Sequence, residues 1–172
     1  MMSVCDDKGG YRMRQAMTRR PLRRPLLPVL VVEDDEATRE ALCYLLEDSG
    51  YQVSEAANGL RALEYLRANA GHCVVLADWW MPEMDGLRLL DTIAHTPTLA
   101  NRYTFILMTA AYTPALMEQP TLRLLTHQRL LRLLRKPFDI DVVLSLVADA
   151  VDEAQDMIGR AQRGAAHSSQ LN

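Results

Sequence analysis

Cysteine is scarce in this chain, and its few residues are scattered. Cys5, Cys43 and Cys73 form no Cys-x-x-Cys pair and show no Cys/His ligand spacing. Such a distribution argues against a disulfide framework and against a structural zinc site. We therefore expect a protein of the reducing cytoplasm.

The chain also lacks a hydrophobic run long enough to span a membrane. The stretch from Arg19 to Val32 places arginines ahead of an apolar run, as a signal peptide does. This stretch ends abruptly in Glu33-Asp34-Asp35-Glu36, without a small-residue cleavage site. We expect neither a cleaved leader nor membrane binding.

Positive charge is rare outside the N-terminus. Residues 1–28 hold seven Lys/Arg and two Asp, a balance of +5, whereas residues 29–172 hold twelve Lys/Arg and twenty acids, a balance of −8. The acidic remainder argues against direct binding of nucleic acid. With 172 residues, 49% of them hydrophobic, the chain suffices for one domain. We predict a disordered basic arm at 1–27, a folded domain at 28–156 and a flexible tail at 157–172.

Short apolar runs alternate with amphipathic stretches after Pro28, a pattern typical of repeated βα units and a parallel sheet. We predict strands at 29–32, 51–55, 73–77 and 103–109. We predict helices at 35–49, from 58–59 onward, at 86–94 and at 139–154. The leucine-rich segment 114–135 fits a helix as well as a strand; we expect a short, irregular helix and then a strand near 130–134.

Charged and polar residues stand where four of these strands end. They are Glu33-Asp34-Asp35, Asp78, Thr109 and Lys136. The carboxyl ends of parallel strands meet at one edge of a sheet, where ligands bind. Several carboxylates in one cavity repel each other unless a cation lies among them. A hard divalent ion with oxygen ligands, Mg²⁺, meets this requirement.

The same edge has the parts of a phosphoryl-accepting site. A carboxylate that takes up a phosphoryl group needs a metal and cationic donors to offset the charge on the phosphoryl oxygens. Lys136 can contact one such oxygen, and the Thr109 hydroxyl with the Ala110 amide can bind another. Singly, each feature has an ordinary structural explanation, since acids favour the first turn of a helix. Their combination at successive strand ends points to phosphoryl chemistry.

Four motifs resemble those of response-regulator receiver domains, the phosphoacceptors of two-component signalling. They are Val31-Val32-Glu33-Asp34-Asp35, Asp78-Trp79-Trp80-Met81-Pro82-Glu83-Met84-Asp85-Gly86, Ile106-Leu107-Met108-Thr109-Ala110 and Lys136-Pro137-Phe138. The resemblance covers roughly residues 28–154. It implies an α/β, doubly wound (βα)₅ domain of flavodoxin-like fold, with a five-stranded parallel sheet in the order 2-1-3-4-5.

The resemblance also implies roles for individual residues. Asp78 would be the phosphoacceptor. Mg²⁺ would be held by Asp34, Asp78 and the main-chain carbonyl of Trp80, and by Glu33 mainly through water.

On the cationic side, Lys136 would precede a cis peptide bond to Pro137 and point at the phosphoryl group. Thr109 would move toward that group on phosphorylation, and Ala110 would contribute its amide.

As a receiver, the chain would take its phosphoryl group from a histidine kinase, a phosphotransfer protein or a small phosphodonor, and would act on a downstream protein partner. It would not be an ordinary enzyme, although it would assist its own phosphorylation and dephosphorylation. The sequence leaves the oligomeric state open, a homodimer included.

The chain departs from the family pattern in three places. Leu133 stands where the family has an aromatic residue. The interval from Thr109 to Lys136 is longer than usual. Trp80 and Ala111 occupy the positions that flank the path of a hydrolytic water, and we hypothesise that they slow the loss of the phosphoryl group.

Two alternatives remain. The first is a phosphorylation-independent scaffold that acts through the unusual 114–135 face. The second, a phosphatase similar to the haloacid dehalogenases, is disfavoured, because Trp80 stands where such an enzyme needs a second acid.

Overall fold

The computed structural model describes residues 27–100, 102–110, 120–128 and 130–169. The predicted basic arm at 1–27 lies outside the described residues except for its last residue, Leu27.

A single parallel sheet forms the centre of the described structure, and its strand order β2-β1-β3-β4-β5 confirms the prediction. The strands are β1 (Val29–Val32), β2 (Val53–Ala56), β3 (Cys73–Asp78), β4 (Tyr103–Thr109) and β5 (Leu131–Arg135). Every residue of β1, β3 and β4 is buried, as continuous apolar runs predict for a sheet covered on both faces. The second strand begins two residues later than predicted, at Val53.

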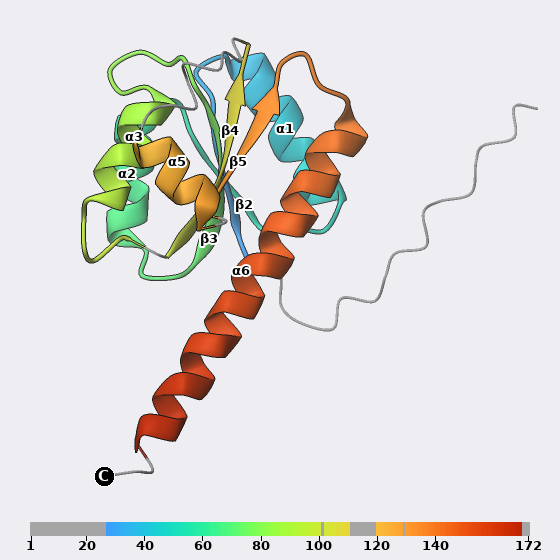
Figure 1. Cartoon of the computed structure of the whole chain (residues 1–172). Helices are drawn as coiled ribbons and strands as arrows, with labels where there is room; N and C mark the ends of the chain where they lie inside the picture. Colours follow the sequence, from blue (N-terminus) through green and yellow to red (C-terminus); the bar gives the residue numbers. More distant parts are fainter. Residues whose placement is uncertain (1–26, 101, 111–119, 129, 170–172) are drawn as a thin grey trace, which may run out of the picture.

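Helices cover both faces of the sheet (Figure 1). They are α1 (Glu36–Asp48), α2 (Gly59–Ala68), α3 (Gly86–Ala94), α5 (Pro120–His127) and α6 (Ile140–Ser169). Helices α2, α3 and α5 pack on one face, and α1 and α6 pack on the other. Successive strand residues point to opposite faces, so Leu30 and Val32 join the first cluster while Val29 and Val31 join the second. The doubly wound α/β fold is therefore confirmed.

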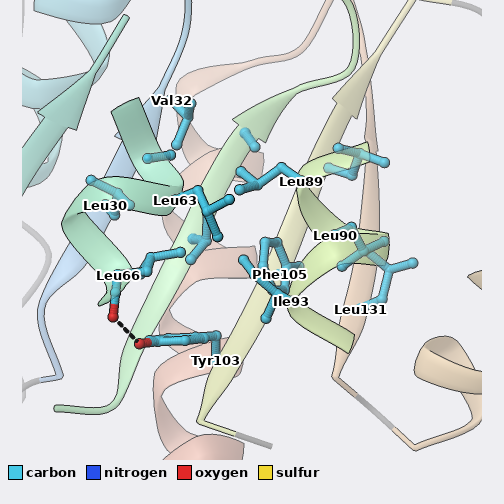
Figure 2. Close-up of a cluster of buried hydrophobic side chains, with 14 of the residues drawn as sticks. Leu30, Val32, Leu63, Leu66, Leu89, Leu90, Ile93, Tyr103, Phe105 and Leu131 are labelled. Carbon is cyan, nitrogen blue, oxygen red and sulfur yellow. Dashed lines mark hydrogen bonds between the residues drawn. The ribbon is translucent and has the colours of Figure 1, made fainter. Parts of the chain in front are cut away.

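Figure 2 shows part of the core between the sheet and helices α2 and α3. Leu63 and Leu66 of α2, Leu89 of α3 and Phe105 of β4 all belong to this buried cluster. The hydroxyl of Tyr103 donates a hydrogen bond of 2.8 Å to the main-chain carbonyl of Leu66 at the end of α2. This bond satisfies a carbonyl in the last turn of the helix, where no intrahelical partner exists.

Helix α6 is much longer than predicted. We expected it to end at Ala154 and a flexible tail to begin at residue 157, but the helix continues to Ser169. Figure 1 shows its second half extending beyond the end of the sheet. Residues 155–169 contain no proline, and eight of these fifteen residues are Ala, Arg, Gln or Met, which favour helix. Met157 also packs against the first core cluster. The helix therefore extends through most of the segment predicted as a tail, and residues 170–172 lie outside the described part.

The leucine-rich segment forms both predicted elements, helix α5 and then strand β5, which starts at Leu131 rather than Leu130. Residues 111–119 lie outside the described residues. Within the described ranges, no helix is both long enough and apolar enough to cross a lipid bilayer.

Candidate functional site

The carboxyl ends of four neighbouring strands bring the predicted site residues to one edge of the sheet. Glu33 directly follows β1, Asp78 ends β3, Thr109 ends β4 and Lys136 directly follows β5. Because β1, β3, β4 and β5 are consecutive neighbours in the sheet, these residues stand side by side at its edge. The expectation drawn from parallel-strand geometry is confirmed.

Three carboxylates gather at this edge. One carboxylate oxygen from each of Glu33, Asp34 and Asp78 lies within 4.8 Å of the others. Glu33 and Asp78 are buried, with 3% and 8% of their surface exposed, while Asp34 is exposed to solvent. Hard oxygen donors, some buried and one accessible, suit Mg²⁺, which retains water ligands when it binds. The residues present fit this ion.

Lys136 carries the positive charge of the cluster. Its ammonium nitrogen lies 2.9 Å from Oδ1 of Asp78 and 3.0 Å from Oε2 of Glu33. Burial alone would lower the pKa of Lys136, but hydrogen bonds to Asp78 and Glu33 and the charges of both carboxylates outweigh it and raise that pKa. The peptide bond from Lys136 to Pro137 is cis, as the resemblance implied.

The pKa of Glu33 is shifted upward. Burial is the largest cause, and the charge of Asp78 adds to the rise, whereas the hydrogen bond from Lys136 opposes it. A further cation close to Glu33 would stabilise the charged form of this carboxyl group, which burial disfavours.

A main-chain hydrogen bond links Thr109 and Lys136. The amide of Lys136 donates a hydrogen bond of 2.8 Å to the main-chain carbonyl of Thr109, which continues the β4–β5 ladder past the end of β5. Thr109 is 1% exposed, whereas Ala110 is exposed. The exposed Ala110 leaves the end of β4 accessible beside the carboxylates.

The two tryptophans after Asp78 differ sharply in exposure. Trp79 is buried in the core, whereas Trp80 is 66% exposed. Ala111 lies outside the described residues, so its predicted effect with Trp80 on hydrolysis stays a prediction. Leu133, which replaces the family's aromatic residue, is partly buried against the core in β5.

The loop between β3 and α3 folds back tightly onto the site. The amide of Gly86 donates to the carbonyl of Trp79 at 3.0 Å, and a Cβ at Gly86 would overlap the main-chain carbonyl oxygen of Asp78. Glu83 adopts a φ of 63° and accepts a hydrogen bond of 3.1 Å from the side chain of Asn58, the N-cap of α2. The loop after Asp78 is therefore anchored both to β3 and to α2.

Arg39 was not identified from the sequence as a residue of the site. It lies on α1 and donates to the main-chain carbonyl of Glu33 at 3.0 Å and to the carboxylate of Glu55 at 3.3 Å. Glu55 lies in β2, a strand from which no site residue had been predicted. The available signal was an arginine one turn after the N-cap Asp35, on the helix that follows residues 33–35, which we call the acidic loop.

Comparison with known proteins agrees with this geometry. A family model described as the response regulator receiver domain matches residues 29–148. The chain belongs to this family.

Among curated relatives, the sensor kinase CckA of Brucella abortus is 44% identical over 69 residues, which cover 40% of this chain and 7% of that protein. The two-component response regulator ORR7 of Oryza sativa subsp. japonica is 37% identical over 71 residues, 41% of this chain and 34% of that protein. Both matches therefore span well under two thirds of the relative's length.

Solved receiver structures share the fold. A CheY-like receiver domain protein from Methanospirillum hungatei has a TM-score of 0.63 at 24% identity and covers 75% of this receiver chain and 97% of its own. The receiver domain of the hybrid histidine kinase CckA has a TM-score of 0.54 at 27% identity and covers 72% of this chain and 98% of its own.

Proposed function

We propose that this receiver accepts a phosphoryl group on Asp78 in a Mg²⁺-dependent reaction and thereby changes its affinity for a protein partner. The observation that carries the proposal is the position of the Lys136 ammonium, in contact with Asp78 and Glu33 within a cluster of three carboxylates. A nucleophilic carboxylate, a cation aimed at it and further oxygen donors are the parts that phosphoryl transfer requires.

In the proposed step, a carboxylate oxygen of Asp78 attacks the phosphorus of a phosphohistidine or of a small phosphodonor. The new O–P bond forms while the bond from phosphorus to the donor breaks, and the donor leaves with the electron pair. Lys136 offsets the negative charge that gathers on the phosphoryl oxygens. Attack of water on the same phosphorus later releases phosphate and restores the carboxylate.

Mg²⁺ would be held by Glu33, Asp34, Asp78 and the main-chain carbonyl of Trp80. When bound, the ion supplies positive charge for the phosphoryl oxygens. Glu33 and Asp78 hold their carboxylates in place because they are buried at strand ends, and the exposed Asp34 keeps the site open to the donor.

Phosphorylation would then act on the end of β4. The phosphoryl group adds about −1.5 to −2 charges at neutral pH. The hydroxyl of Thr109, the last residue of β4, and the amide of Ala110, which follows it, are the donors proposed for this charge. To move the receiver from mostly inactive to mostly active, the phosphoryl group must favour the active conformation by about 5 kcal/mol.

The partners implied are a histidine kinase or phosphotransfer protein as donor and a second protein as target, in the cytoplasm. The acidic charge of residues 29–172 opposes direct contact of the domain with nucleic acid.

The test is chemical trapping of the phosphorylated residue. Treatment with acetyl phosphate and Mg²⁺, followed by borohydride reduction, converts an aspartyl phosphate to homoserine, which tandem mass spectrometry locates in the chain. Homoserine at position 78 supports the proposal. Mg²⁺ binding with no reduced residue would instead favour the phosphorylation-independent scaffold.

A further inference from the structure

Arg39 contacts the acidic loop from outside the carboxylate cluster. Its side chain is 13% exposed, and its guanidinium bonds two acceptors at once, the main-chain carbonyl of Glu33 and the carboxylate of Glu55. These contacts join α1 to the ends of β1 and β2. Such a forked contact suits arginine, whose planar guanidinium presents several donors in fixed directions.

The contact fixes the backbone of Glu33 where regular pairing ends. The amide of Glu33 donates to the carbonyl of Ala56 at 3.2 Å, which extends the β1–β2 ladder by one step. Its carbonyl accepts the 3.0 Å bond from Arg39. Both main-chain polar groups of Glu33 are therefore held, one by β2 and one by α1.

The other end of the loop is held as well. Asp35 is the N-cap of α1: its side chain accepts a hydrogen bond of 2.8 Å from the amide of Thr38, and its carbonyl accepts one of 2.9 Å from the amide of Arg39. Asp34, the exposed member of the cluster, lies between these two anchored residues. Its backbone has little freedom to move without breaking one of these bonds.

We propose that Arg39 is a positioning residue for the metal site, which holds the main chain of Glu33 so that Glu33 and Asp34 present their carboxylates together. This inference rests on the proposed function, because it concerns Mg²⁺ at the same cluster. Arg39 donates to a main-chain carbonyl of the loop and to Glu55, and it acts through the loop's geometry.

The charge of Arg39 and its proposed positioning role predict opposite changes in Mg²⁺ affinity when Arg39 is substituted. A cation beside a metal site repels the incoming ion, so removing the charge of Arg39 would strengthen Mg²⁺ binding if electrostatics alone mattered. If Arg39 holds the loop, removing it weakens binding, because the ligands must then be ordered when the ion binds. The direction of the change in affinity therefore separates the two roles.

The experiment measures the Mg²⁺ dissociation constant of the full chain without phosphodonor, from tryptophan fluorescence or amide NMR shifts. We expect Arg39→Met to raise this constant about tenfold, as loss of an outer contact to metal ligands commonly does. Arg39→Lys keeps the charge but cannot make the forked contact, so we expect a smaller rise in the same direction. The matched control is Arg61→Met on α2, which removes an exposed pair with Glu64 and leaves the constant within about twofold of wild type.

A second readout excludes a merely structural role. The rate of labelling by acetyl phosphate at saturating Mg²⁺ should stay close to wild type for Arg39→Lys, while the Mg²⁺ concentration that gives half this rate rises. An unchanged or lower dissociation constant in both Arg39 variants would overturn the inference and leave the proposed function intact. No Mg²⁺ binding by the wild type would overturn both. If Arg39→Met does not fold, the Mg²⁺ dissociation constant of Arg39→Lys alone tests the inference.

Discussion

The ammonium nitrogen of Lys136 lies 2.9 Å from Oδ1 of Asp78, although a whole strand, β4, separates β5 from β3 in the sheet. The long lysine side chain, leaving the chain directly after β5, crosses the end of β4 to reach the carboxylate. The contact places a cation on the proposed nucleophile before any phosphoryl group arrives. It also partly offsets the cost of burying Glu33 and Asp78 together.

Loss of Lys136 should therefore destabilise the metal-free protein. In Lys136→Met, Glu33 and Asp78 remain buried without their shared cation, and we expect unfolding in urea with EDTA to require about 1–3 kcal/mol less free energy. Added Mg²⁺ should restore part of this loss, because it again places positive charge among the carboxylates. The neighbouring exposed residue gives the control, Arg135→Met, which should change little. Equal stability of the two variants in EDTA would contradict the account.

The raised pKa of Glu33 predicts how stability depends on pH. An acid whose pKa is raised by folding stabilises the protein fully while it is protonated, below its unfolded pKa, and this contribution is lost as the pH rises through the folded pKa. Glu33→Gln cannot ionise, so its stability relative to wild type should increase from pH 4 to pH 7 in EDTA. Urea midpoints at several pH values measure this difference. The exposed Glu64→Gln serves as control, and a flat difference for Glu33→Gln would show that burial of this carboxylate costs nothing.

The tight return of the loop after Asp78 depends on Gly86. In Gly86→Ala, the added methyl group meets the carbonyl oxygen of Asp78 and lies 2.7 Å from a methyl carbon of Leu107. We expect a loss of about 1–3 kcal/mol in the free energy of unfolding, the usual cost of overpacking. At Gly71 a Cβ meets nothing within 4 Å, so Gly71→Ala should stay within about 0.5 kcal/mol of wild type. Similar denaturation curves for both variants would count against this packing.

The two described cysteines should be unreactive in the folded protein. Burial raises the pKa of Cys73 to about 12 and that of Cys43 to about 11. At pH 7.5 the thiolate fraction of each is then below about 0.1%, and the thiolate is the reactive form. In a Cys5→Ser background, an aromatic disulfide reagent should find no fast-reacting thiol until urea unfolds the chain. Rapid native labelling of one equivalent would mean that the packing around one of these residues is looser than described.

Much of the fold could be predicted, because its signals are local. The runs at Val29–Val32 and Tyr103–Thr109 are apolar throughout, and only a strand buried on both faces needs such a run. The strand ends then follow from the polar residues that stop each run, which is why Asp78 and Lys136 could be placed at one edge. The roles of the site residues came from the resemblance of their motifs.

The features that sequence reasoning missed depend on contacts or on weak preferences. Helix α6 continues past Ala154, where Met157 still packs against the core and residues of good helix propensity follow. Leu60 is one of the leucines of α2 yet is 40% exposed, because the buried face of this helix is formed by Gly59, Ala62, Leu63 and Leu66. Arg39 gains its role only when α1 and the ends of two strands meet in space.

The measurement that tests the central claim most directly is the intact mass of the protein after incubation with acetyl phosphate, with and without Mg²⁺. The wild type should gain about 80 Da only when Mg²⁺ is present. Asp78→Asn should gain nothing. Asp85→Asn, in the same loop, should be labelled like the wild type, because asparagine can keep the N-cap bond of α3. An adduct that persists in Asp78→Asn, or a folded wild type that no phosphodonor labels, would contradict the account.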